Sequence, residues 1–169
     1  MSRGFVKEED QEEVPIVPQR AYLPEGVTNF VTRTGMDQLL AEKEILINEK
    51  DNLGSTNENE KRIALNYINA KLQLLNNRIT GARVVDLKKQ PQNEIRFGAM
   101  ITLKTEVSGN IQIFQIVGVD EANIAKGKIS FISPLAKALI NKKVGDVITL
   151  KRDREDIVFE IMNIAYRGS

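Results

Sequence analysis

Side chains that could carry chemistry are few in this chain. It has no cysteine and no histidine, which excludes disulfides, thiolate nucleophiles, Ser-His-Asp triads and every metal site built on those ligands. Any metal would therefore be a hard cation held by oxygen atoms, such as Mg²⁺. The most suggestive carboxylates are Glu49 and Asp51, which precede the turn-forming run NLGSTNENE at 52–60, and Glu58 and Glu60, which lie at its end. The alternative is that they only solubilise the turn and favour the start of the next helix.

Two predicted helices flank this turn. The second, over 57–82, has apolar residues at alternating spacings of three and four, which is the heptad pattern of a coiled-coil seam; they are Leu65, Ile68, Leu72, Leu75, Ile79 and Ala82. The first, over 35–52, has a broken stripe of Met36, Leu39, Leu46 and Leu53, with Lys43 and Lys50 at two seam positions. These stripes predict an antiparallel helical hairpin. The alternative is two ordinary helices packed on a globular core.

The helix ends carry recognisable caps. Thr34 to Asp37 resembles a capping box with Asp in place of Glu or Gln, which predicts that the first helix starts there. Ser55, Thr56 or Asn57 could cap the second. Ile45 and Ile47 lie off the main seam and could face a second copy, although a monomer is the favoured state.

From residue 83 the apolar period changes to two, which is typical of strands. The predicted strands are Arg83–Asp86, Ile101–Lys104, Ile111–Val117, Lys128–Ile132, Val147–Lys151 and Ile157–Ile164. One short helix interrupts them, with Ser133 as its N-cap and Pro134 at its first position. An antiparallel sheet with one short helix makes residues 83–169 an α+β domain, and the hairpin occupies 26–82.

Residues 1–25 are predicted to be a tail. Lys7 to Glu13 are almost all charged and three prolines follow, so the segment buries too little apolar surface to offset its ordering entropy. We expect it to be flexible, or at most to drape on the body through Phe5, Val14, Ile16 and Val17.

Composition narrows the function classes. The net charge of +1, from 24 basic and 23 acidic residues, argues against a general nucleic-acid binder. The chain has no apolar run long enough to span a bilayer and no signal peptide, so we expect a cytoplasmic protein without a membrane partner.

Several short blocks in the second half of the chain have a recognisable order and spacing. They are Phe97-Gly98, Ile116-Val-Gly-Val-Asp120-Glu121-Ala, Gly127-Lys-Ile-Ser130, Ser133-Pro134-Leu-Ala-Lys-Ala-Leu-Ile140, Lys143-Val-Gly-Asp146 and Ile164-Ala-Tyr166. Through these blocks, residues 83–166 resemble the FKBP-like domain of the Gre family of bacterial transcription elongation factors, and 31–35 and 68–85 resemble parts of that family's two hairpin helices. The first helix is about ten residues shorter than the resemblance leads us to expect, or about 15 Å. The family's acidic tip motif is absent, so the chain resembles a short-hairpin subgroup.

The resemblance implies a partner and a mechanism. Gre factors dock on bacterial RNA polymerase at the rim of its secondary channel, and their tip carboxylates help to bind the second Mg²⁺ of the polymerase active site. The polymerase supplies the chemistry, so the factor has no catalytic site or cofactor of its own, and it contacts RNA and DNA only indirectly. The family's docking mode implies a polymerase contact at Asp120, Glu121, Ser133 and Pro134, with Leu135 and Lys137 as weaker members.

Three functions follow as hypotheses. The first is a regulator that binds RNA polymerase without strongly stimulating transcript cleavage, because a hairpin shortened by about 15 Å would hold its tip short of the active site. The second is an active cleavage factor that uses the acidic tip with Mg²⁺. The third is a peptide-binding or isomerase-like FKBP module, which the low aromatic content of 5% and the lack of tryptophan disfavour.

Overall fold

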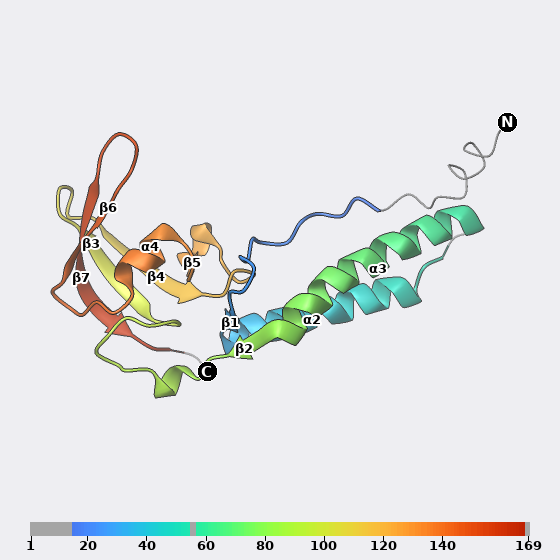
Figure 1. Cartoon of the computed structure of the whole chain (residues 1–169), viewed down its shortest axis with the longest axis horizontal. Coiled ribbons are helices and arrows are strands. Elements are labelled where there is room, and N and C mark those ends of the chain that lie inside the picture. Colours follow the sequence, from blue (N-terminus) through green and yellow to red (C-terminus); the bar gives the residue numbers. More distant parts are fainter. Residues whose placement is uncertain (1–14, 55–56, 168–169) are drawn as a thin grey trace.

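The computed structural model describes residues 15–54 and 57–167. A helical hairpin projects from a curled sheet, so the described chain is elongated (Figure 1). The hairpin consists of α2 (Arg33–Asp51) and α3 (Glu58–Gly81). At 1.5 Å per residue, their 19 and 24 residues span about 29 Å and about 36 Å. The predicted hairpin is thus confirmed, as is a following α+β region.

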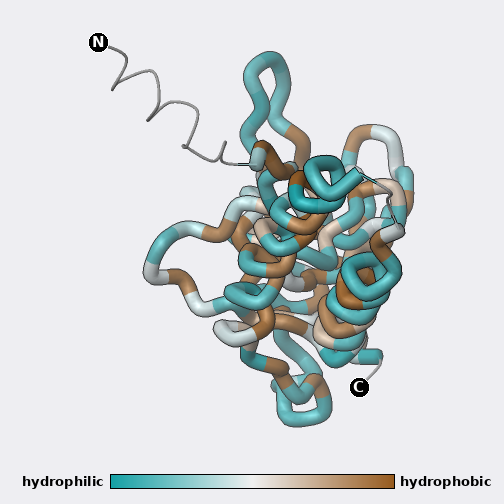
Figure 2. Tube along the Cα trace, turned by 90° about the vertical axis from the view of Figure 1, so that its right-hand side faces the viewer, coloured by the Kyte–Doolittle hydropathy of each residue, from teal (hydrophilic) through white to brown (hydrophobic). Residues whose placement is uncertain are grey.

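The core of the hairpin is one seam between its helices. Leu39 and Leu46 of α2 and Ile68 and Leu75 of α3 are buried in a single cluster with Val31. The other seam residues that pack against this cluster are Met36, Leu53, Leu72, Ile79 and Ala82. The heptad pattern predicted these residues of both helices, whereas Leu65, which it also predicted, is partly buried outside this cluster. Figure 2, which views the hairpin from its tip, shows mostly hydrophilic residues at the helix ends nearest the viewer.

The first helix begins earlier than the sequence predicted. Its N-cap is Thr32, whose hydroxyl oxygen accepts a hydrogen bond from the backbone nitrogen of Gly35 at 2.9 Å. The predicted capping box at Thr34–Asp37 is therefore wrong, because Thr32 has the extended backbone that a cap requires. The second helix is capped by Asn57, whose side chain accepts from the backbone nitrogens of Asn59 and Glu60. Ser55 and Thr56 lie outside the described residues.

Two short strands close the base of the hairpin. β1 (Asn29–Val31), which leads into α2, pairs in parallel with β2 (Ala82–Val84), which leaves α3. The strand predicted at 83–86 thus starts one residue earlier and does not join the main sheet. The two strands meet because the start of α2 and the end of α3 lie at the same end of the hairpin, and their parallel pairing shows that they do not simply extend the antiparallel helices.

The main sheet has the strand order β5-β4-β3-β7-β6. Its strands are β3 (Met100–Thr105), β4 (Ile111–Val117), β5 (Lys128–Ser130), β6 (Val147–Leu150) and β7 (Ile157–Ala165). All neighbours are antiparallel except β4 and β5, which are parallel. The predicted antiparallel sheet is wrong at this pair, because the 118–127 connection crosses back before β5 begins.

One face of this sheet holds the second core. The helix α4 (Pro134–Leu139) contributes Ala136 and Leu139 to a cluster that includes Ile101, Ile116 and Ile161, and all five are fully buried. Two short 3-10 turns, η1 (Leu87–Lys89) and η2 (Ile124–Lys126), lie in the connections. No helix of the described ranges is long and apolar enough to cross a membrane.

In the described part of the predicted tail, Arg20 rather than Ile16 contacts the body. Ile16 is 94% exposed and Val17 is only partly buried, whereas Arg20 forms hydrogen bonds to the body. The expectation for Ile16 was therefore wrong. Phe5 and Val14 lie outside the described residues.

The hairpin seam should dominate the stability of this half of the chain. Replacement of the fully buried Leu75 by Ala should lower the free energy of unfolding by about 2–5 kcal/mol, because it leaves a cavity between the helices. Leu40→Ala, at a position 41% exposed on α2, is the matched control and should change it by about 0.5 kcal/mol or less. Urea titration measures both, and equal losses would contradict this account of the seam.

Candidate functional site at the tip and base of the hairpin

The four tip carboxylates lie in the open at the far end of the hairpin. Glu49 and Asp51 are in the last turn of α2, Glu58 and Glu60 are in the first turn of α3, and all are exposed. The described parts of the chain contain no group of three or more Asp, Glu, His or Cys side chains that could hold a metal ion. A cation at this tip would thus need most of its ligands from a partner.

The two pairs of tip carboxylates differ in their structural value. Glu58 and Glu60 lie at a helix N-terminus, where negative charge is favourable. Glu49 and Asp51 lie at a helix C-terminus, where negative charge is unfavourable and only Lys50 supplies a compensating cation in that turn. Helix stability therefore accounts for Glu58 and Glu60, but not for Glu49 and Asp51.

At the base of the hairpin, Glu121 joins the sheet to α2. Its carboxylate, in a residue only 7% exposed, accepts hydrogen bonds from the hydroxyl of Thr32 at 2.5 Å and the ammonium of Lys128 at 3.2 Å. Thr32 is also the cap of α2, so one hydroxyl connects the helix start to the sheet loop. A Cβ atom at Gly35 would lie 2.7 Å from the nearer carboxylate oxygen, which explains the glycine there.

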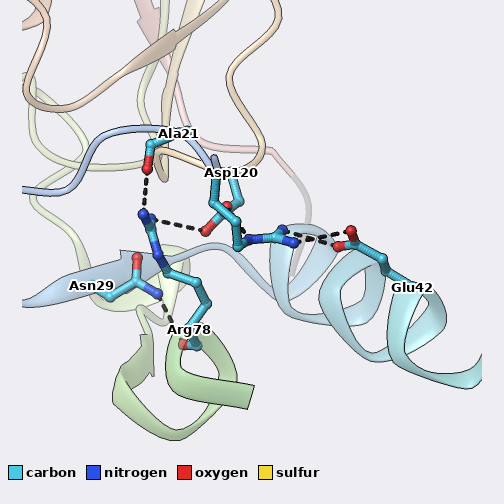
Figure 3. A network of polar contacts seen from close by, with 6 residues as sticks. Ala21, Asn29, Glu42, Arg78 and Asp120 are labelled. Carbon is cyan, nitrogen blue, oxygen red and sulfur yellow. Dashed lines mark hydrogen bonds and ion pairs between the residues drawn. The ribbon is translucent and has the colours of Figure 1, made fainter. Parts of the chain in front are cut away.

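Asp120 is the centre of a second network at the base (Figure 3). Its carboxylate accepts from Nε of Arg20 at 3.1 Å and from Nη1 of Arg78 at 3.4 Å. Arg20 also forms a two-pronged pair with Glu42 of α2, at 3.0 and 2.9 Å. The hydrogen bond to Glu42 is the main reason that the pKa of Arg20 lies above its usual value.

Arg78 and Asn29 complete this network. Arg78 donates to the backbone oxygen of Ala21, and its own backbone oxygen accepts from the side-chain nitrogen of Asn29 at 3.1 Å. The network thus joins the tail, β1, both hairpin helices and the loop after β4 (Figure 3).

Close backbone packing supports the same junction. A Cβ atom at Gly118 would lie 2.6 Å from the backbone oxygen of Phe30, so only glycine lets β1 approach the end of β4 this closely. The rings of Phe30, Phe97 and Phe131 form a trio with centroids 5.7–6.0 Å apart. Polar and aromatic contacts together fix the base of the hairpin on the sheet.

The start of α4 presents a different surface. The Ser133 hydroxyl caps this helix by accepting from the Ala136 backbone nitrogen at 3.3 Å, and Leu135 packs against the sheet core. Pro134 and Lys137 are exposed. Because β4 and β5 are parallel, the loops that follow them leave the sheet at the same end of the strands. The candidate residues therefore share one end of the sheet, but Asp120 and Glu121 face the hairpin rather than solvent.

Sequence reasoning missed the partners that hold this junction. Arg20, Thr32, Arg78 and Lys128 each bind a carboxylate of the loop after β4. Arg20 and Asp120 are 100 positions apart, and no local pattern links them. The sequence signal for Arg20 was an arginine between prolines, in a segment predicted to be flexible or to drape on the body through apolar side chains.

Comparison with known proteins now identifies the family. The family described as "Transcription elongation factor, GreA/GreB, C-term" matches residues 90–166, which contain the main sheet and α4. GreA of Neorickettsia sennetsu is 30% identical over 154 residues, covering 82% of this chain and 97% of that protein. The chain belongs to the GreA/GreB family of transcription elongation factors. GreA of Hyphomonas neptunium is 31% identical, covering 72% of this chain and 80% of its own length.

Other relatives match over a shorter part. The aligned regions span 64% of GreA from Maricaulis maris and 59% of GreA from Beijerinckia indica, at 35% and 37% identity, and cover 59% and 55% of this chain. Among solved structures, Gfh1 of Thermus thermophilus has a TM-score of 0.40 at 23% identity, covering 84% of this chain and all of that one. A GreA/GreB factor of Nitrosomonas europaea has a TM-score of 0.42 at 16% identity, covering 83% and 99%.

Thr32 and Glu121 should be energetically coupled through the hydrogen bond between their side chains. Thr32→Ala should cost about 0.5–2 kcal/mol through the lost cap, and Glu121→Ala about 1–3 kcal/mol because it leaves Lys128 and the hydroxyl without their partner. The double variant should lose at least about 0.5 kcal/mol less than the sum of the two. Urea unfolding of all four proteins measures this coupling, and strictly additive losses would contradict a direct bond.

Proposed function

We propose that this protein is a transcription elongation regulator that binds bacterial RNA polymerase near its secondary channel and stimulates transcript cleavage weakly or not at all. Membership of the GreA/GreB family carries the proposal, supported by matches to the family over both the hairpin and the sheet. The protein needs no cofactor of its own in this role. Any Mg²⁺ at its tip would belong to the polymerase active site, and contact with RNA or DNA would be indirect.

The length of the hairpin argues against strong cleavage. The first helix ends at Asp51 after 19 residues, about ten fewer than the family resemblance leads us to expect, which leaves the tip about 15 Å short. A carboxylate side chain cannot bridge such a gap. A hairpin of this size can still fill the mouth of a channel, compete with longer factors and hinder nucleotide entry.

The fold of the base suggests distinct roles for the candidate docking residues. Pro134 and Lys137 are exposed at the start of α4 and suit direct contact with the polymerase. Asp120 and Glu121 are occupied by internal partners and suit the orientation of the hairpin relative to the docking surface. Ser133 and Leu135 hold α4 in place.

The competing function is active cleavage through the tip. Glu49 and Asp51 favour it, because carboxylates at a helix C-terminus destabilise the helix and are unexplained by the fold. An FKBP-like peptide-binding or isomerase role has no comparable support in the geometry, and catalysis in a proline isomerisation assay would argue for it against both.

Polymerase binding provides the first test. Immobilised bacterial core polymerase should retain the protein, and a full-length GreA should displace it. Lys137→Glu should weaken binding about tenfold by reversing an exposed charge in the contact, whereas Lys88→Glu, an exposed lysine in η1, should have little effect. Absence of binding, or binding that GreA does not displace, would contradict the proposal.

Transcript cleavage separates the two polymerase-bound functions. Backtracked elongation complexes with Mg²⁺ should shorten their RNA far more slowly with this protein than with GreA. If cleavage reaches the rate seen with GreA and the combined alanine variant of Glu49, Asp51, Glu58 and Glu60 abolishes it, the weak-cleavage proposal is replaced by the competing one. A GreA control confirms that the complexes are competent.

A further inference from the structure

Residues 15–22 take an unusual path for a tail. They leave the base and run beside the hairpin without regular secondary structure (Figure 1). Pro15 and Pro18 restrict the backbone of this segment, which lowers the entropy lost when it is held in place. Ile16 does not hold it, because that side chain is 94% exposed, and a hollow of about 290 Å³ lies between the segment and Leu46 and Leu74 of the hairpin.

Arg20 is the residue that fastens this segment. Its side chain is only 19% exposed, and it pairs at once with Glu42 on α2 and Asp120 on the sheet loop. A guanidinium can serve both carboxylates because its donors form a rigid planar fork, whereas a lysine ammonium is a single point. The next residue, Ala21, accepts a hydrogen bond from Arg78 of α3. Two consecutive residues thus bind both helices and the sheet.

The positions of these contacts make a triangle. Thr32 and Glu121 form the pivot where α2 meets the sheet. Glu42 lies nine residues beyond the start of α2, about 14 Å along its axis. A link from Glu42 through Arg20 to Asp120 therefore braces the helix at a distance from its pivot. A pivot alone permits bending, and a second attachment further out resists it.

We infer that residues 15–22 form a strap that fixes the angle of the hairpin on the sheet, with Arg20 as its fastening. Loosening the strap lets the hairpin tip sweep over a wider range while both cores stay folded. The alternative is that the contacts only add stability, without any influence on the angle.

Distance measurements on the full chain distinguish a strap that fixes the hairpin angle from contacts that only add stability. The chain has no cysteine, so spin labels at Lys61→Cys near the hairpin tip and Thr149→Cys on β6 report one distance by pulsed electron paramagnetic resonance. The parent should give one narrow distribution. Arg20→Ala should widen it at least twofold, and Arg152→Ala, an exposed arginine in the β6–β7 loop, should not.

Two more variants keep the test decisive. Glu42→Ala removes only the outer attachment from a partly exposed position, so it should widen the distribution even if Arg20→Ala fails to fold. Arg20→Lys should fall between the parent and Arg20→Ala, because it retains charge but not the fork. A distribution as narrow in both alanine variants as in Arg152→Ala would overturn the strap.

A binding measurement extends the inference and rests on the proposed function. A hairpin with a variable angle pays an ordering cost on entering a channel, so Arg20→Ala should bind core polymerase several-fold more weakly than Arg152→Ala. If the parent does not bind polymerase at all, the proposed function is wrong, but the distance measurement still shows whether residues 15–22 fix the angle of the hairpin. If the distribution widens and affinity is unchanged, the strap does not serve polymerase binding.

Discussion

The buried carboxylate of Glu121 is the contact on which the arrangement of the whole molecule depends. A desolvated carboxylate is costly unless it is paired. Here it is paired with Lys128 of its own sheet and with Thr32, the cap of α2. The Thr32 hydroxyl both caps α2 and bonds it to the sheet, so the same side chain sets where the helix starts and where the hairpin attaches. The absence of a Cβ at Gly35 makes room for this contact.

The neighbouring Asp120 extends this junction to the rest of the chain. Its carboxylate gathers Arg20 from the N-terminal segment and Arg78 from α3, which belong to otherwise separate parts of the sequence. Residues that the family resemblance suggested as partner contacts thus have internal partners. We therefore propose that Asp120 and Glu121 orient the hairpin, and that the exposed start of α4 makes the direct contact with the polymerase.

The carboxylates at the tip and at the base of the hairpin lie in different electrostatic environments. At the base, carboxylates are buried and each has a cation. At the tip, Glu49 and Asp51 are exposed at the helix end where their charge is least favourable. A departure from local stability at an exposed end is the pattern expected where function, rather than folding, selects the residue. Folding therefore accounts for the carboxylates of the base, and not for Glu49 and Asp51 at the end of α2.

The sequence by itself determined the elements with a strong local period. The heptad spacing of Ile68 and Leu75 specified the hairpin seam, and Ser133-Pro134 specified α4, because these signals arise within a few turns of chain. Only the tertiary structure decided the parallel pairing of β4 with β5 and the bonds of Arg20 to Asp120. Those contacts join distant segments, and their energy comes from burial and charge pairing that exist only after the chain has folded.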